Sequence, residues 1–159
     1  MRLRARMLRR SAMNILPLGA DESPEVTALL DANGLPTADL STKVSLFGVR
    51  DVRGLEGVVG MEVYEDVALL RSLAVRHDRR GSGLGSALVL EVERLAGASG
   101  VSELYLLTTT TEAFFSHRGY TRLSRTMAPA AIRGTTEFTS VCPDSAAFMR
   151  KPLEPIVTP

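Results

Sequence analysis

Cysteine is almost absent from this chain. Cys142 is the one cysteine among 159 residues, so an intramolecular disulfide is excluded and a reducing compartment is favoured. A zinc site of the usual kind is also disfavoured, because such sites draw on paired cysteines. Long apolar runs are missing as well, and none approaches the roughly 18 residues of a membrane span. We therefore expect a cytoplasmic protein with no membrane anchor and no bound metal.

An excess of basic charge is missing from most of the chain. Five arginines fall within residues 1–12, which hold no acid, and the remainder carries 14 basic and 18 acidic residues. The net negative charge of the chain outside residues 1–12 does not suggest a nucleic-acid partner. The basic start could be an arm for nucleic acid or anionic lipid, or part of a transit peptide. Because it has no apolar stretch to bury, we expect a basic, disordered tail over residues 1–12.

The length and the hydrophobic content of 45% predict one domain with a substantial core, over residues 13–159. Apolar runs and turn signals predict an α/β (α+β) chain. Helices are expected from Ser23 until Asn33-Gly34, and over 83–98, 112–118 and 128–139. Strands are expected over 14–19, 44–50, 55–64, 67–75, 103–108, 120–125 and 145–151.

Residues 69–86 organise the rest of the chain. An apolar strand is followed by a charged turn, then by the glycine-rich loop RGSGLG at residues 80–85, then by an apolar helical pattern. Glycine lets the backbone approach a ligand, because no Cβ intervenes. The first amides of the following helix have no partner and lie at the positive end of its dipole. The stretch predicts an anion site suited to a pyrophosphate, with a tight strand-to-helix turn as the plainer interpretation.

The spacing within this loop separates the known phosphate-binding patterns. A P-loop is excluded because there is no lysine, and a dinucleotide fingerprint because the glycines at 81, 83 and 85 miss its spacing. What remains is Arg80-x-x-Gly83-x-Gly85 after a strand that ends in Leu-Ala-Val. This pattern resembles the acyl-CoA pyrophosphate loop of the GNAT superfamily, the acetyl-CoA-dependent N-acetyltransferases.

A second motif agrees with this resemblance in order and spacing. Residues 113–120 read AFFSHRGY, which is similar to the GNAT signature in which a short helix with an aromatic pair ends in Gly-Phe or Gly-Tyr. The resemblance covers residues 14–152. More narrowly, the segments LLRSLAV, ELYLLTTTTEAFF and PAAIRGTTEF with CPDSAAFMRKPL are similar to a branch often associated with arsenic-resistance operons.

The superfamily resemblance implies a fold and a cofactor site. The fold is a mixed, mostly antiparallel sheet with a splayed parallel pair in the middle, strands 67–75 and 103–108, and with helices on both faces. The pantetheine arm of acetyl-CoA, the co-substrate, would enter between the splayed strands, and the amide near Val75 would hold the thioester oxygen. The implied cofactor-binding residues are Leu73, Ala74, Val75, Arg80, Gly81, Ser82, Gly83, Leu84, Gly85, Ser86, Thr108 and Phe115.

One departure from the superfamily pattern concerns catalysis. Relatives often carry a tyrosine that protonates the departing thiolate, where this chain has Phe115, and losing a general acid costs about 10²–10⁴-fold. A thiol with a pKa near ~8.5 is acidic enough that the thiolate could leave without help. The other substitutes are Tyr105, His117, Tyr64, Ser72 or water, and we take Tyr105 as the working choice.

Three further side chains are candidates for the acceptor side. Glu62 is the candidate base for the amine, although a strand carboxylate in water is the plainer interpretation. Arg71 and Arg133 could bind a carboxylate, phosphonate or arsonate on the substrate, or have a surface or ion-pair role.

We therefore expect an N-acetyltransferase (EC 2.3.1) that acetylates the amine of a small molecule, with organoarsenical resistance as the finer interpretation. A non-catalytic CoA-binding or sensory module is the alternative that Phe115 motivates, and protein N-acetylation is another. No nucleic-acid or membrane partner is expected. The oligomeric state stays open, although homodimers are frequent among similar proteins.

Overall fold

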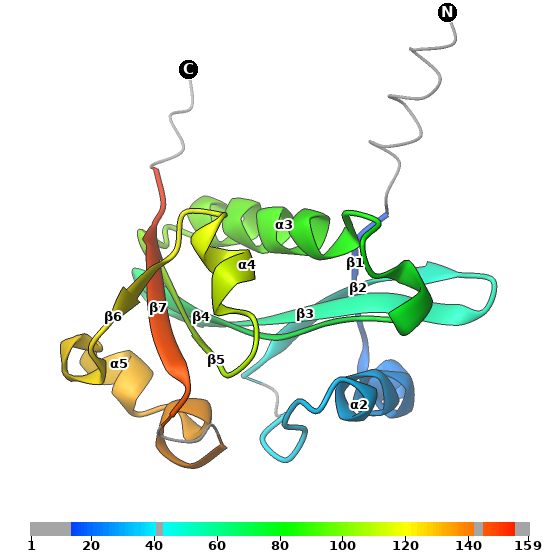
Figure 1. Ribbon diagram of the computed structural model, residues 1–159, viewed down its shortest axis with the longest axis horizontal. Coiled ribbons are helices and arrows are strands. Elements are labelled where there is room, and N and C mark those ends of the chain that lie inside the picture. The colour runs from blue at the N-terminus through cyan, green and yellow to red at the C-terminus, as the bar shows by residue number, and fades with distance from the viewer. Residues whose placement is uncertain (1–13, 41–42, 142–144, 155–159) are drawn as a thin grey trace, which may run out of the picture.

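A computed structural model describes residues 14–40, 43–141 and 145–154 (Figure 1). The tail over residues 1–12 and Cys142 lie outside the described residues, so the expectations for them stay predictions. The strands are β1 (Leu16–Pro17), β2 (Ser45–Asp51), β3 (Gly54–Tyr64), β4 (Val67–Val75), β5 (Glu103–Thr108), β6 (Thr121–Leu123) and β7 (Ala147–Pro152). The α-helices are α2 (Ser23–Ala32), α3 (Leu84–Ala98), α4 (Glu112–Ser116) and α5 (Ala130–Arg133). Shorter turns are the 3₁₀ segments η1 (Ala20–Glu22), η2 (His77–Arg79) and η3 (Arg125–Met127) and the π-helical η4 (Glu137–Val141).

The strands form one sheet in the order β1-β2-β3-β4-β5-β7-β6. Only β4 and β5 run parallel among the described strands, and the other neighbours pair antiparallel. Helices α3 and α4 lie on one side of the sheet, and α2 and α5 lie on the other (Figure 1). The expected fold class, a mostly antiparallel mixed sheet with a central parallel pair and helices on both faces, is confirmed.

The parallel pair separates after a few residues. Pairing between β4 and β5 covers three positions, from Val67 opposite Glu103 to Leu69 opposite Tyr105. Beyond Leu69, β4 continues along β3 and β5 continues along β7. A β-bulge lies in this part of β4, since Arg71 and Ala74 pair with residues only two apart on β3. At the bulge Ser72 adopts φ +57°, a left-handed conformation that a non-glycine residue adopts at a cost.

Helix α3 holds the two halves of the sheet together. Its residues Leu84, Leu88 and Val92 are almost fully buried, as their helical spacing predicts. They pack into one hydrophobic cluster with residues from both sides of the gap, such as Met61 from β3 and Leu106 from β5. The separation of β4 from β5 is therefore spanned by packing of α3 rather than by a backbone ladder.

The helix expected over residues 128–139 is wrong. The chain forms the single turn of α5, passes Gly134, and resumes in η4. The hydroxyl of Thr135 donates to the carbonyl of Ile132 at 2.7 Å and accepts the amide of Phe138 at 3.3 Å. Such local side-chain bonds compete with the helical ladder, and they reshape this segment.

None of the helices in the described residues combines the length and the apolarity that crossing a membrane requires.

Candidate active site

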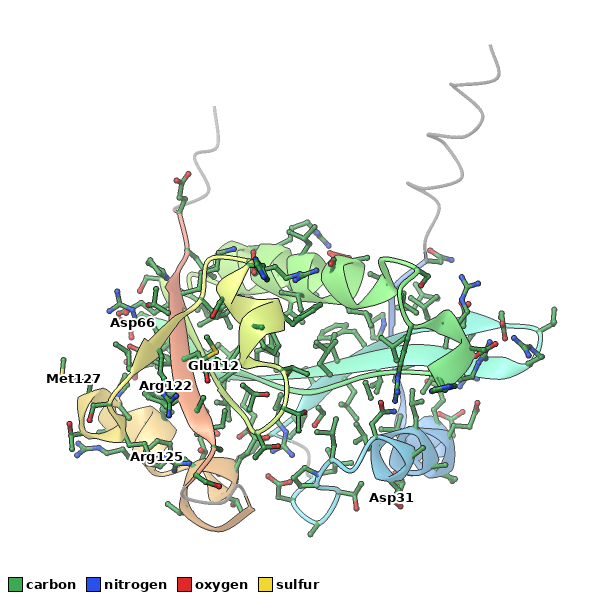
Figure 2. The ribbon with its side chains drawn as sticks, in the orientation of Figure 1. Asp31, Asp66, Glu112, Arg122, Arg125 and Met127 are labelled. Atoms are coloured by element: carbon green, nitrogen blue, oxygen red, sulfur yellow. The ribbon has the colours of Figure 1, made fainter. Side chains whose placement is uncertain are left out.

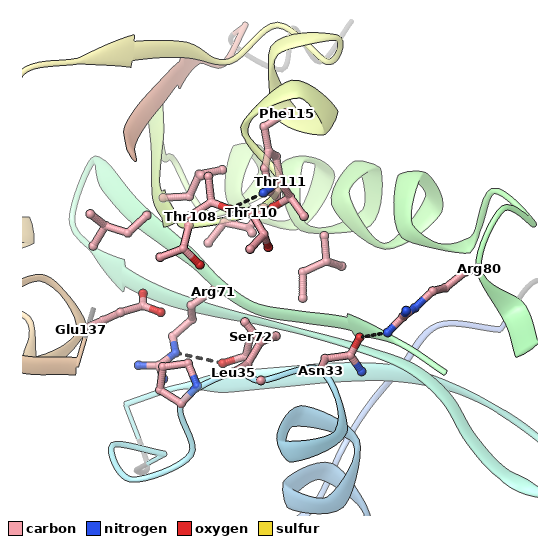
Figure 3. A pocket seen from close by; sticks show the side chains of 17 residues that line it. Asn33, Leu35, Arg71, Ser72, Arg80, Thr108, Thr110, Thr111, Phe115 and Glu137 are labelled. Atoms are coloured by element: carbon pink, nitrogen blue, oxygen red, sulfur yellow. Dashed lines mark hydrogen bonds between the residues drawn. The ribbon is translucent and has the colours of Figure 1, made fainter. Parts of the chain in front are cut away.

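A cavity of about 930 Å³ occupies the space where β4 and β5 part. Its volume falls in the range of small-molecule sites. In Figure 3 the threonines at the end of β5 and Phe115 lie on one side of the strands, and Arg71, Asn33 and Glu137 lie on the other. The cavity therefore connects the α3–α4 side of the sheet to the α2–α5 side. Its lining residues are those at 33–36, 70–73, 80, 106–111, 115 and 137.

The glycine loop lies beside this cavity, at the start of α3. Gly81 and Gly83 adopt φ +77° and +88°, which L side chains rarely adopt, and a Cβ placed on either would meet open space. Gly83 caps α3 without a side chain, and the first turn carries no acid. The first amide that donates back into the helix is that of Ala87, to the carbonyl of Gly83 at 3.1 Å. A bare, positively polarised helix start with open space above it is suited to a phosphate group.

Arg80 joins this loop to the end of α2, across the cavity. Its Nη2 donates to Oδ1 of Asn33 at 2.7 Å, and both residues line the cavity. On the other side of the loop, the hydroxyl of Ser86 accepts from Arg118 (Nε at 3.1 Å and Nη2), and this guanidinium lies 3.6 Å from the centre of the Phe114 ring. These contacts fix the first turn of α3 relative to α4.

The open edge of β4 carries the next set of expected residues. The amide of Arg76 donates to the carbonyl of Glu56 on β3 at 2.7 Å, so by strand alternation the backbone groups of Val75 face the opposite edge, toward β5. No strand pairs with this edge beyond Leu69 within the described residues. Leu73 lines the cavity, whereas Ala74 is buried against the α2 side.

Across the gap from β4, the cavity wall is formed by the end of β5 and by α4. Thr108 is fixed by Thr111, with the two hydroxyls 2.6 Å apart and the amide of Thr111 donating to Oγ1 of Thr108 at 3.0 Å. Phe115 lines the cavity but is only 3% exposed. Its ring packs edge-on against Phe114 and Tyr120, at 5.0 and 5.3 Å between centroids.

A buried ion cluster lies on the α2–α5 side. Nη1 of Arg71 donates to Asp39 at 2.5 Å and to Glu62 at 2.9 Å, and Nη2 donates to Asp39 at 2.6 Å. Burial alone would lower the pKa of Arg71, but the hydrogen bond to Asp39, the charge of Glu137 and the hydrogen bond to Glu62 outweigh it and raise that pKa. Tyr64 donates to Glu62 at 2.5 Å, and burial together with this carboxylate raises the pKa of Tyr64 to about 12. Arg71 therefore stays charged and Tyr64 stays protonated at neutral pH.

Tyr105 and Arg133 do not line the cavity, and neither do Glu62, Ala74, Val75 or residues 81–86 of the glycine loop. Tyr105 is 3% exposed, stacks on Phe148 at 5.4 Å, and donates to Glu103 at 3.2 Å. Burial first, and then the charge of Glu103, raise the pKa of its hydroxyl. It lies where β4 and β5 are still paired. Arg133 is exposed at the end of α5.

Sequence reasoning missed Asp39, Asn33 and Glu137. Asp39 and Asn33 lie in irregular chain after α2, where no periodicity marks a functional position. Glu137 follows the break after α5, and a continuous helix had been expected there. The neighbours of Glu137 in the sequence are largely polar, so no apolar stretch marks this acid as buried.

Part of this sequence is similar to known proteins. Residues 44–122 match the model of the acetyltransferase (GNAT) domain family. An uncharacterised N-acetyltransferase of Chlorobaculum tepidum is 33% identical over 88 residues, which are 54% of this chain and 56% of that protein. The chain thus spans about half the length of this curated relative.

Solved structures match nearly the whole chain. N-acetylglutamate synthase from Neisseria gonorrhoeae, complexed with coenzyme A and L-arginine, superposes with a TM-score of 0.73 at 20% identity, over 89% of this chain and 33% of that one. The ribosomal-protein-S18-alanine N-acetyltransferase from Escherichia coli superposes with a TM-score of 0.68 at 19% identity, over 91% and 96%. At these identities the likeness shows the fold.

Proposed function

We propose that this chain, which belongs to the GNAT superfamily, is an acetyl-CoA-dependent N-acetyltransferase (EC 2.3.1) that acts on the amine of a small molecule. The observation that carries the proposal is the early parting of β4 and β5, which leaves a cavity of about 930 Å³ beside a bare helix start. The family match over residues 44–122 includes β4, the glycine loop and β5, so it supports the same assignment.

The glycine loop would bind the pyrophosphate of acetyl-CoA. The backbone amides of Gly81, Gly83, Leu84, Gly85 and Ser86 would donate to it, and the open space at the two left-handed glycines supports this role. Ser82 belongs to the same loop. Arg80 would add a charge-assisted contact to the pyrophosphate, either in place of its hydrogen bond to Asn33 or in addition to it.

The edge of β4 would bind the pantetheine arm as a substitute strand. The backbone groups of Val75 face the gap, and Leu73 lines it. Across the gap, Thr108 would offer a hydroxyl and Phe115 an apolar surface. An acyl-CoA molecule placed in this way would pair with backbone groups that β5 leaves open.

The reaction is an acyl transfer. The neutral amine attacks the thioester carbonyl, a C–N bond forms, the C–S bond breaks, and the amine loses one proton. The amide near Val75 would stabilise the developing oxyanion. Glu62 does not line the cavity, so it would take the proton through water. Among the four side chains considered as replacements for the missing acid, Ser72 lines the cavity, and we propose it or water as the proton donor for the thiolate.

The finer interpretation, an amine-bearing organoarsenical as acceptor, rests on sequence similarity in three segments and stays a prediction. It would place a negatively charged arsonate close to Arg71. Thiol release from acetyl-CoA with an amine-bearing organoarsenical as acceptor tests this interpretation.

One pair of variants tests the cofactor site. Gly83→Glu places a carboxylate at the start of α3, and we expect CoA binding to be lost because that anion occupies the phosphate site. Gly100→Glu is the matched control, since Gly100 has φ +87° and open space at the opposite end of the same helix. Backbone strain is therefore similar in both variants. Calorimetric titration with CoA measures the difference, and equal loss of affinity in the two variants would contradict the proposal.

Thiol release with a panel of small amines tests catalysis. We expect acceptor-dependent release of CoA from acetyl-CoA. Phe115 favours one second candidate, a CoA-binding module without turnover, because this residue cannot donate a proton. Tight CoA binding with no release on any acceptor would favour that module.

A further inference from the structure

Ser72 lies at the point where β4 leaves β5. The ladder between the two strands ends at Leu69, and the β-bulge that follows on β4 contains Ser72. Its backbone adopts φ +57°, a strained conformation for a residue other than glycine. Strain of this kind persists only where the surrounding structure enforces it, and it is concentrated at functional sites. Ser72 is 8% exposed and lines the cavity, so the strained position indicates a role for its side chain there.

The hydroxyl of Ser72 is held by Arg71. Nε of Arg71 donates to Oγ of Ser72 at 3.1 Å, a bond drawn in Figure 3. The other two nitrogens of this guanidinium are bound to Asp39 and Glu62, which fixes the whole group in one orientation. An arginine side chain has donors only, so the hydroxyl proton of Ser72 cannot point at Arg71. Among the residues that the structure describes, this hydroxyl donates to none.

This arrangement leaves the proton of Ser72 available to a molecule in the cavity. A serine hydroxyl donates one hydrogen bond and accepts two, and the contact with Arg71 uses one acceptor position. Other hydroxyls in the lining are less suited to give a proton. Those of residues 109–111 are exposed to solvent, and that of Thr108 is paired with Thr111. Ser72 therefore has the one lining hydroxyl that is both buried and held by a charged donor.

We propose that Ser72, rather than free water, is the catalytic acid of this site and that Arg71 is its positioning residue. This inference rests on the proposed function, because it assigns one proton of the same acyl transfer. As the C–N bond forms and the thioester C–S bond breaks, the hydroxyl of Ser72 gives its proton to the departing sulfur. The proton that the amine loses through water replaces it at Oγ, so one proton leaves nitrogen for each that reaches sulfur. Arg71 acts on the reaction through this hydroxyl and does not bind the acceptor.

Two variants separate the hydroxyl of Ser72 from its strained backbone. Ser72→Ala removes the hydroxyl and keeps the strain, whereas Ser72→Gly removes both, because glycine adopts a positive φ freely. We expect Ser72→Gly to have the higher Tm of the two. The rate of thiol release in a single turnover should nevertheless fall equally in both, by roughly 10²-fold, the lower end of the range for a lost general acid. The affinity for CoA should be nearly unchanged in calorimetric titration.

Hydroxylamine is the acceptor in this assay, because it is small and already uncharged at neutral pH. Deprotonation of an ammonium therefore does not limit the rate, and the uncatalysed reaction is subtracted. Glu65→Ala and Glu65→Gly are the matched controls, since Glu65 has φ +58° in the exposed turn between β3 and β4. Their Tm values should differ in the same direction, with the rate unchanged. Rates that follow Tm in the Ser72 variants, or that equal the unmodified rate, would overturn this inference and leave the proposed function intact.

Arg71→Lys tests the positioning role. Lysine keeps a cation beside Asp39 and Glu62 but has no Nε–H that could hold the hydroxyl of Ser72. We expect the single-turnover rate to fall by about 10-fold in this variant, the lower end for a hydrogen bond from a charged group. In combination with Ser72→Ala it should cause no further loss, because Arg71 acts through that hydroxyl. Losses that multiply in the double variant would overturn the role of Arg71. An unmodified chain that binds CoA but accelerates thiol release with no amine, hydroxylamine included, would instead overturn the proposed function.

Discussion

Arg71 shows how strongly one buried charge can depend on its partners. Its side chain is 1% exposed and carries the only cation among the described residues that contacts both Asp39 and Glu62. Replacing such a pair by apolar groups can be neutral, but removing one partner leaves the others charged and buried. The cluster is therefore a place where a single substitution has a large effect on folding.

Arg71→Met should lower the free energy of unfolding by about 3–5 kcal/mol, because it leaves two buried carboxylates without their cation. Arg50→Met is the matched control, since Arg50 also binds two carboxylates, Glu22 and Glu25, but lies at the surface. Solvent screens that pair of contacts, so a much smaller loss is expected. Urea denaturation of the two variants measures both effects. Similar losses would show that the buried cluster contributes no more than a surface pair.

The sequence-based predictions for single residues had different outcomes. A residue type indicates what chemistry its side chain can do, but not which residues that side chain will contact. Arg71 was expected to bind substrate, since an arginine beside the gap suits an anion. Asp39, 32 positions earlier in the chain, occupies that guanidinium, and nothing in the irregular segment around it indicates this contact. The left-handed conformations of Gly81 and Gly83 could be predicted from the sequence, because only glycine adopts them without strain.

At the scale of elements, an ion-pair chain positions η2 ahead of the glycine loop. Arg76, just after β4, contacts Asp51 at the end of β2 at 2.6 Å and Asp78 of η2 at 2.7 Å. Arg53 from the β2–β3 turn also contacts Asp78. The hairpin and the loop that enters α3 are thereby joined by side chains of opposite charge.

Asp78→Asn should reveal a pH-dependent contribution of these ion pairs to the stability of the fold. The hydrogen bond from Arg76, and then that from Arg53, lower the pKa of Asp78 to about 2. A lowered pKa in the folded state means that the ionised form stabilises the fold above the unfolded value of about 3.9. The Tm difference between the unmodified chain and the variant should therefore be present above about pH 4. It should disappear as the pH falls toward about 2.

Thermal unfolding across this pH range, followed by circular dichroism, provides the measurement. A Tm difference that stays constant down to acid pH would show that Asp78 acts through something other than its charge. The effect on CoA affinity is a second readout, because η2 leads directly into the loop at residues 80–83.

Elements were easier to predict where a continuous pattern defined them. Strands β4 and β5 have the predicted bounds, because each is an apolar run between turn residues. The segment 128–139 failed because the hydroxyl of Thr135 makes local bonds that a periodicity argument does not include. The bulge at Ser72 could not be predicted either, since it arises from the register between β3 and β4 rather than from β4 alone.

At the scale of the whole molecule, the sheet consists of two halves joined by a short parallel ladder and by α3. Strands β1 to β4 form one half, and β5, β7 and β6 form the other. Three paired positions connect them directly, and the cluster beneath α3 packs across both halves on one face. On the other face Val67 and Leu69 of β4 belong to one hydrophobic cluster with Tyr105 of β5 and Phe148 of β7. A ligand that pairs with the open edge of β4 would complete the sheet between the halves. Cofactor binding and global stability are thus expected to be coupled.

CoA at about 100 times its Kd should add about 2.7 kcal/mol to the free energy of unfolding, because it binds only the folded chain. For a chain of this size that corresponds to a rise in Tm of roughly 5–10 °C. Amide hydrogen exchange should slow at Leu73 and Val75, whose edge of β4 has no strand partner in the described residues. Differential scanning calorimetry and exchange mass spectrometry measure the two effects. The Gly83→Glu variant should show neither, whereas Gly100→Glu should show both. Stabilisation without protection of β4 would mean that CoA binds elsewhere, and the parted strands would then need another occupant.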